Sequence, residues 1–122
     1  LGFAVANRWE GFLILLAGDV ELHLGEWHGH DPERTDGGFY LRVDDADAVY
    51  GPLRDGLERD GVLYLAPADG LTPAHTAELR ARQAAGETLV RLHEIADKPW
   101  GTREFTVIDP GGNAVRVGHV PA

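Results

Sequence analysis

The residues best suited to chemistry stand in one dense stretch, 97–105, which reads Asp-Lys-Pro-Trp-Gly-Thr-Arg-Glu-Phe. Pro99 stiffens the backbone and Gly101 frees it, so together they predict a turn that presents Trp100. An aromatic side chain in such a turn is suited to stacking on a ligand, and it is also suited to anchoring a core or an interface. We therefore predict that this stretch forms one wall of a small-molecule pocket.

Other groupings of reactive residue types are weaker. Residues 28–31 (His-Gly-His-Asp) include metal-binding side chains, but short histidine-rich loops usually bind no metal. Residues 111–112 (Gly-Gly) fit a hairpin turn and not a phosphate loop, because no helix follows them. The aspartates within 44–47 are better explained as helix caps than as an acid–base pair. No serine- or cysteine-based nucleophile arrangement is visible, so we predict no catalytic residues.

Composition narrows the choice of partners. The chain has 122 residues, and 20 acidic side chains against 11 lysines and arginines give a net charge of −9. This balance disfavours nucleic acid and membrane surfaces as partners and favours a cationic ligand. There is no cysteine, which excludes disulfides and thiolate metal sites and suits a cytoplasmic location. The sequence starts at Leu1 and contains no methionine, so we expect a native N-terminal segment to be missing.

Hydrophobic periodicity predicts mainly short strands with two helices. Aspartates 44–45 cap a helix whose apolar residues recur through 46–57, and Pro52 predicts a kink or a broken first turn there. A second helix, between residues 72 and 86, has Leu79 as its one large apolar side chain and should lie at the periphery. The predicted strands are residues 3–5, 12–16, 20–24, 39–43, 62–65, 89–92, 103–108 and 113–120.

Two distant segments of the chain resemble each other. Aligning residues 12–25 with 105–118 without gaps matches Phe12 with Phe105 and keeps the apolar positions of both strands in step. One interpretation is a duplicated β-rich module whose two copies close a common core. The other is that any two amphipathic hairpins look alike.

In their order along the chain, several motifs resemble the vicinal oxygen chelate superfamily, and within it the bleomycin resistance proteins. The resemblance covers nearly the whole chain except residues 66–90, which look like an insertion carrying the second helix. The motifs are Leu-Gly-Phe at 1–3, Gly-Asp-Val-Glu-Leu-His-Leu at 18–24, Leu-Arg-Val-Asp-Asp at 41–45, Asp-Lys-Pro-Trp-Gly at 97–101, Arg-Glu-Phe at 103–105 and Asp-Pro-Gly-Gly-Asn at 109–113.

This resemblance implies an α+β fold in which paired βαβββ modules form a cupped mixed sheet. The chain would be a single domain, 1–122, with 1–37 as the remainder of the first module plus a linker. Residues 38–122 would be the second module, with the insertion at about 66–90. The strand and helix that open the first module would be missing. The resemblance also implies a homodimer with ligand clefts between subunits.

The superfamily contains metal enzymes and metal-free binders, and the resemblance indicates which group this chain fits. Gly38, or its neighbour Phe39, stands where the enzymes carry a histidine ligand, and Arg116 stands where they carry a glutamate. Arginine is permanently cationic and cannot coordinate a metal ion. His23, the repeat equivalent of Arg116, is the one ligand type left. We therefore expect no metal and no cofactor; a metal-dependent glyoxalase-like lyase or extradiol-type dioxygenase is the alternative.

The resemblance implies that the protein sequesters bleomycin, a cationic glycopeptide with a flat bithiazole, and does not modify it. Phe12 and Trp100 match the family's two stacking aromatics, although Phe12 also fits a core position. Glu104, with Asp97 and Glu21, would attract the cation, and a different metabolite stays open as the ligand. The candidate ligand-binding residues are Phe12, His23, Trp27, Phe39, Tyr40, Trp100, Glu104 and Arg116.

Overall fold

The computed structural model describes residues 3–18, 20–25 and 38–121 of the chain. The chain forms two compact units, Leu1–His30 and Asp31–Ala122, and each is described by itself. None of the helices in the described residues is long and apolar enough to cross a membrane.

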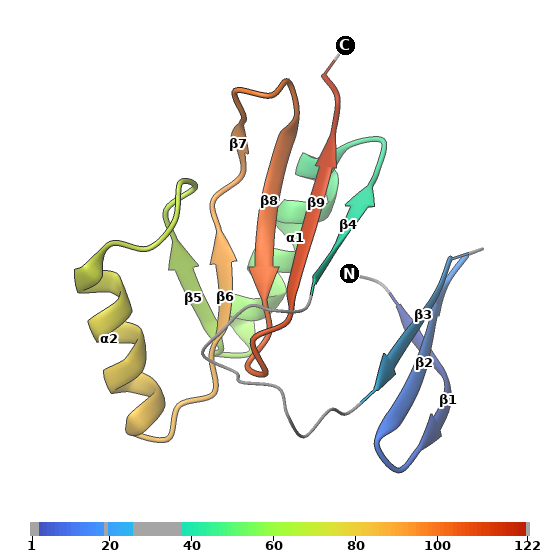
Figure 1. The fold of residues 1–122 in the computed structure, drawn as a ribbon, viewed down its shortest axis with the longest axis horizontal. Helices are drawn as coiled ribbons and strands as arrows, with labels where there is room; N and C mark the ends of the chain where they lie inside the picture. Colours follow the sequence, from blue (N-terminus) through green and yellow to red (C-terminus); the bar gives the residue numbers. More distant parts are fainter. Residues whose placement is uncertain (1–2, 19, 26–37, 122) are drawn as a thin grey trace. The chain divides into compact units, whose positions relative to one another are not determined.

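The first unit is a three-stranded antiparallel sheet, drawn in blue in Figure 1. Its strands are β1 (Ala4–Trp9), β2 (Phe12–Ala17) and β3 (Val20–Gly25), in that order across the sheet. The sequence predicts β2 and β3 but ends β1 at residue 5, because the polar pair Asn7 and Arg8 interrupts its apolar pattern. Pairing with β2 carries β1 on to Trp9, past an irregularity between Val5 and Asn7.

The second unit is built on a mixed sheet with the order β4-β9-β8-β6-β5. Strands β4 and β9 run parallel, as do β5 and β6, whereas β8 is antiparallel to both β9 and β6. The short β7 pairs with β8 beside this path. The strands are β4 (Gly38–Arg42), β5 (Leu63–Ala66), β6 (Val90–His93), β7 (Ala96–Asp97), β8 (Arg103–Ile108) and β9 (Ala114–His119).

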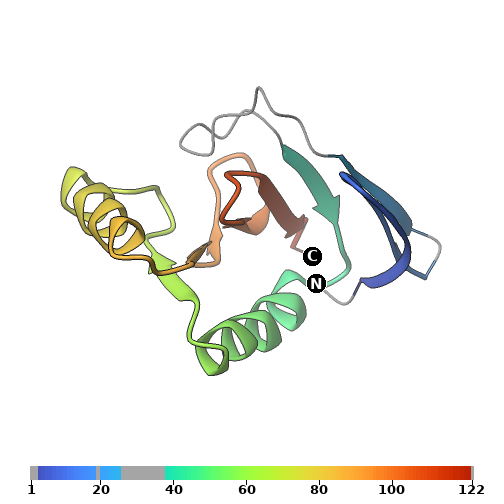
Figure 2. The ribbon, with the colours of Figure 1, turned by 90° about the horizontal axis from the view of Figure 1, so that it is seen from below.

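Helix α1 (Ala46–Arg59) covers one face of this sheet and closes the core (Figures 1 and 2). The side chain of Asp45 accepts hydrogen bonds from the first turn, as its capping prediction requires. The helix continues through Pro52, so the predicted broken first turn is wrong. Tyr50 meets Phe105 edge to face at 5.3 Å between ring centroids, above fully buried Leu92.

Helix α2 (Pro73–Ala84) lies on the β5 side of the unit (Figure 2). Thr72 caps it together with His75, whose ring reaches back to the backbone N–H of Thr72. Leu79 is the one buried residue of the helix, so the predicted small contribution to the core is confirmed. Leu79 packs with Tyr64 and Leu89 in a cluster separate from the one under α1.

Strand registers correct the comparison between the two hairpins. His23 lies opposite Ile14 in the first hairpin, and Arg116 lies opposite Thr106 in the second. If His23 and Arg116 are equivalent, these registers make Ile14 equivalent to Thr106. The alignment without gaps instead matches Ile14 with Val107, one residue further along the chain. The segment linking the second pair is one residue longer, so an alignment without gaps cannot keep both the Phe12–Phe105 match and the His23–Arg116 match.

Candidate functional site

The face of the second sheet away from α1 carries a row of polar and aromatic side chains. Because side chains alternate along a strand, Phe105 and Val107 enter the core under α1 while Glu104 and Thr106 lie on the opposite face. Cross-strand partners share a face, so Arg116 lies on this opposite face beside Thr106. Tyr40 joins them, since β4 pairs it with Arg116.

An ion pair lies at the centre of this face. Arg116 Nη2 donates a hydrogen bond to Glu104 Oε1 at 2.8 Å. Glu104 is only 2% exposed, while about half of the Arg116 side chain remains accessible. Glu104 Oε2 and the hydroxyl of Thr102 are also buried, and neither has a hydrogen-bond partner among the described residues. Burial of a carboxylate at this depth requires the cation beside it.

The guanidinium of Arg116 also lies against two aromatic rings. It is 5.6 Å from the ring centroid of Tyr40 and 5.9 Å from that of Trp100, both within cation–π range. Trp100 is 61% exposed, so its ring is available to a ligand. Of the two functions that the sequence left open for Trp100, the described residues exclude a core role.

The predicted turn is what presents Trp100. Lys98 and Thr102 close it, with the Lys98 N–H donating to the Thr102 carbonyl at 2.7 Å. Gly101 has φ 93°, a left-handed conformation that glycine adopts without strain. This turn leads directly into β8 (Arg103–Ile108), which carries Glu104.

Electrostatics keeps the pair charged. Burial raises the pKa of Glu104, but the hydrogen bond from Arg116 and the neighbouring hydroxyls of Tyr40 and Thr102 outweigh it, and the net pKa lies below the usual value. Burial, followed by the nearby Glu104 carboxylate, raises the pKa of Tyr40. At neutral pH the cluster therefore contains one carboxylate, one guanidinium and a neutral phenol.

Gly118 on β9 makes room for this cluster. A Cβ at this position would overlap the Tyr40 hydroxyl and come within 2.8 Å of Glu104 Cβ. Sequence reasoning missed Gly118, although a glycine inside a strand marks a close approach of neighbours. It also missed Thr102, which closes the turn just before β8 and has a buried hydroxyl.

Replacing Gly118 with alanine is expected to lower the free energy of unfolding by about 1–3 kcal/mol, the usual cost of overpacking. Urea denaturation measures this loss. Gly51→Ala is the matched control, because a Cβ there meets nothing within 4 Å and alanine favours a helix. Equal stability of the Gly118→Ala variant and the wild type would contradict the packing described.

The remaining candidate residues are Phe39, Trp27, Phe12 and His23. Phe39 pairs with Val115 and lies on the opposite face of β4 from Tyr40, so these two candidate residues do not share a face of the sheet. Trp27 lies outside the described residues. Phe12 and His23 belong to the first unit and make an edge-to-face contact there at 5.7 Å.

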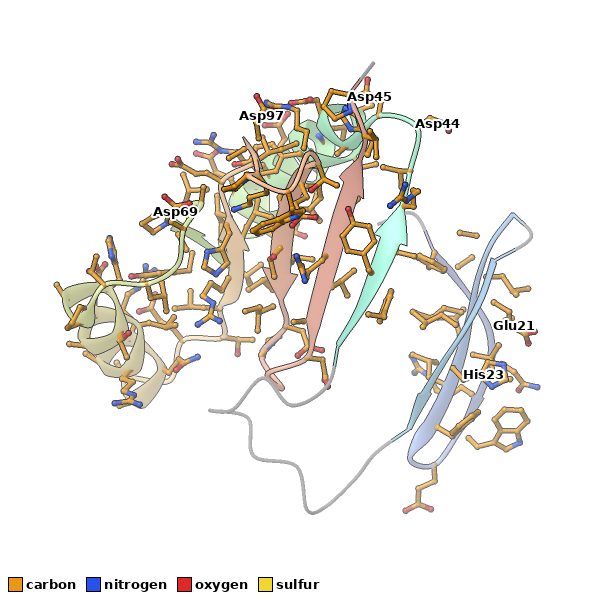
Figure 3. All side chains as sticks on the ribbon, turned by 45° about the horizontal axis from the view of Figure 1, so that its top comes forward. Glu21, His23, Asp44, Asp45, Asp69 and Asp97 are labelled. Atoms are coloured by element: carbon orange, nitrogen blue, oxygen red, sulfur yellow. The ribbon has the colours of Figure 1, made fainter. Side chains whose placement is uncertain are left out.

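The acidic residues expected to attract a cation already have partners. Glu104 is bound to Arg116, as described above, and Asp97 accepts a hydrogen bond from Arg103 at 3.3 Å. Glu21 lies 3.1 Å from His23 on β3 (Figure 3). The contribution of each of these carboxylates to cation attraction is therefore shared with a neighbouring basic side chain.

The residues at the enzymes' metal position do not suit a metal ion. The described residues contain no group of three or more histidine, cysteine, aspartate or glutamate side chains able to hold one. Arg116 occupies the position where the resemblance places a glutamate ligand, and it uses the one nearby carboxylate, Glu104. A guanidinium offers no lone pair for coordination.

The chain has a mixed α+β fold, and this fold matches that of solved bleomycin-resistance and glyoxalase-family structures. The bleomycin resistance determinant encoded on transposon Tn5 is 22% identical, with a TM-score of 0.64 over 99% of this chain and 81% of that one. A bleomycin-binding protein complexed with bleomycin is also 22% identical, with a TM-score of 0.64 over 98% of this chain and 81% of that one.

A third solved structure with a similar fold has glyoxalase in its name. It is a glyoxalase/bleomycin resistance protein/dioxygenase from Nocardioides, 16% identical, with a TM-score of 0.53 over 98% of this chain and 68% of that one. No protein-family model and no curated protein matches the chain. At these identities the similarity shows the fold, and the predicted fold class is confirmed.

Proposed function

We propose that this protein binds a flat, aromatic, cationic small molecule without a metal ion, and that it acts by stoichiometric sequestration of a bleomycin-type antibiotic. The observation that carries the proposal is the exposed indole of Trp100, held over the Arg116–Glu104 pair. A ring in this position loses little conformational entropy when a planar ligand stacks on it.

The preference for a cation comes from the whole chain and not from a free carboxylate at the site. Glu104 and Asp97 are both paired, so neither offers an unshared charge to a ligand. The net charge of −9 supplies a long-range field that raises the local concentration of cations. This field is screened by salt, so bleomycin association should slow as ionic strength rises.

The proposal includes a homodimer, as the resemblance to bleomycin resistance proteins implies. A second protomer would complete the open face around Trp100, which the residues of one protomer leave largely accessible. Phe12 stays a predicted ligand contact within this proposal. Light scattering of the purified protein measures the oligomeric state, and a monomer at micromolar concentration would contradict the dimeric form of the proposal.

The direct test is a titration with metal-free bleomycin, followed by tryptophan fluorescence and by thermal unfolding. Quenching that saturates at a fixed stoichiometry and a rise in Tm are expected, because a ligand that binds only the folded state stabilises it. Absence of both effects at saturating drug would refute the bleomycin assignment while leaving other flat ligands to be screened.

Elemental analysis tests the metal-free part of the proposal. Protein purified without chelators is expected to carry no stoichiometric metal, because Arg116 occupies a ligand position and engages Glu104. Nickel, zinc, manganese or iron at one equivalent per site would favour the glyoxalase-like or dioxygenase-like enzyme instead.

A further inference from the structure

A pocket of about 490 Å³ lies on the second unit, away from Trp100 and the Glu104–Arg116 pair. Helix α2, strand β6 and the turn between β8 and β9 line it. None of the candidate residues from the sequence contributes to it. Its volume falls within the range of about 300–1,000 Å³ that is usual for small-molecule sites.

The pocket combines an apolar wall with a partly buried cation. Arg91 on β6 lines it, and the Nε of this side chain is buried without a hydrogen-bond partner among the described residues. Burial also lowers the pKa of Arg91, which marks a guanidinium stripped of part of its hydration. The apolar wall consists of Leu71, Leu79, Leu89, Ile108 and Pro110.

The two carboxylates that line the pocket accept hydrogen bonds from residues other than Arg91. Glu87 accepts two hydrogen bonds from Arg82, at 2.9 and 3.0 Å. Asp109 accepts from the backbone and the side chain of Asn113, at 2.8 and 3.1 Å. Within the described part of the chain, Arg91 has no ion pair with a carboxylate. Arg91 is therefore a cation without an ion-pair partner among the described residues, in a protein whose net charge is −9.

The remaining polar side chains of the lining also suit an anion. Arg80 has no ion-pair partner in the described ranges, and Thr76 and Thr88 offer hydroxyl donors. A guanidinium presents its N–H groups in a fork that matches two oxygens of a carboxylate or phosphate. An apolar body attached to that head would lie against the leucine-rich wall.

We propose that this pocket is a second binding site, which takes an amphipathic anion with a carboxylate or phosphate head on Arg91 and an aliphatic body against α2. This site is independent of the proposed drug-binding function, because the two sites share no residue. Helix α2 forms one side of the pocket, since Leu79 and Arg80 come from that helix.

Calorimetric titration of the full chain with four probes of equal chain length tests the proposal. Octanoate and octyl phosphate carry the anionic head, whereas octanol and octylamine carry the same tail without it. At least one of the two anions is expected to bind about tenfold more tightly than octanol, and the preferred anion distinguishes a carboxylate from a phosphate ligand. Binding of octanol or octylamine as tightly as both anions, or no binding of either anion, would overturn the proposal.

Variants assign the anion to Arg91. Arg91→Gln is expected to weaken binding of the preferred anion by about tenfold or more, since it removes the charged hydrogen bonds. Arg54→Gln, on the exposed side of α1, is the matched control and should leave affinity unchanged. Unchanged affinity in Arg91→Gln would overturn the assignment. Bleomycin quenching in the same variant should be unaffected, which separates failure of this site from failure of the proposed function.

A measurement on the unmodified protein covers the case in which Arg91→Gln does not fold. Methyl resonances of Leu79 and Ile108 are expected to shift as the preferred anion is added. Those of Leu53 and Val49 on α1 should stay in place, because α1 packs on the other face of the sheet. Shifts confined to the α1 methyls would show that the anion binds elsewhere and would refute the site.

Discussion

Trp100→Ala is expected to weaken bleomycin binding by about tenfold to a hundredfold, the loss typical of an aromatic anchor at an interface. The indole is largely exposed and rests on the guanidinium of Arg116, so truncation removes a stacking surface without opening the core. Stability of the variant should therefore match that of the wild type. Calorimetric titration measures the affinity, because the variant also loses a fluorophore.

Trp9→Phe is the matched control for that experiment. Trp9 is also exposed, but it belongs to the first unit and packs against Phe12 at 5.8 Å. Phenylalanine keeps an aromatic face at that position, so bleomycin affinity should be retained. If Trp100→Ala bound the drug as tightly as the wild type, the assignment of the ligand to this face would be wrong.

Arg116→Met is expected to lower the free energy of unfolding by about 2–4 kcal/mol at pH 7, because it leaves a buried carboxylate without its cation. Glu104 is almost fully buried, and Arg116 is the one charged group that it bonds among the described residues. Methionine keeps much of the aliphatic volume of Arg116, so lost packing contributes little. Urea denaturation at fixed pH measures the change.

The pH dependence of this loss has a definite sign. In the wild type the folded-state pKa of Glu104 lies below its unfolded value of about 4.3. The pair therefore contributes its stability above that pH and loses it as pH falls through the folded pKa. In Arg116→Met, burial raises the folded pKa of Glu104, so the variant is penalised most above the raised pKa. The stability difference between the two proteins should shrink from pH 7 to pH 4.

Two further variants separate this ion pair from an ordinary surface one. Arg103→Met removes an arginine that pairs with Asp47 and Asp97 on an exposed part of the unit, and it should cost about 1 kcal/mol or less. Adding Glu104→Met to Arg116→Met should recover much of the loss, since no buried charge then remains. Equal losses for Arg103→Met and Arg116→Met would contradict the central position given to Glu104.

Local sequence was enough to predict most of the elements. The capping aspartate at 45, the Thr72-Pro73 start of α2 and the Pro-Trp-Gly turn each depend on neighbours within one turn of chain. The exposure of Trp100 also depends on the residues of its own turn. Strand β1 is polar at Asn7 and Arg8, and pairing with β2 decides its length. Sequence reasoning therefore missed the second half of β1.

Registers were beyond the sequence because a shift of one residue moves every side chain of a strand to the other face. That is why the sequence alone could not show that the Phe12–Phe105 and His23–Arg116 matches exclude each other in an alignment without gaps. The fold class could be predicted because several motifs, in their order along the chain, resemble those of a known family.

The sequence by itself determined the class of fold, the turn that presents Trp100, and the arginine at position 116 that does not suit a metal ligand. The tertiary structure alone decided that this arginine is bound to Glu104 and that the acids expected at the site are already paired. It also decided that α2 encloses a pocket around Arg91. The physical reason is that pairing and enclosure depend on contacts between strands and helices distant in sequence, whereas turns and caps are set by residues next to one another.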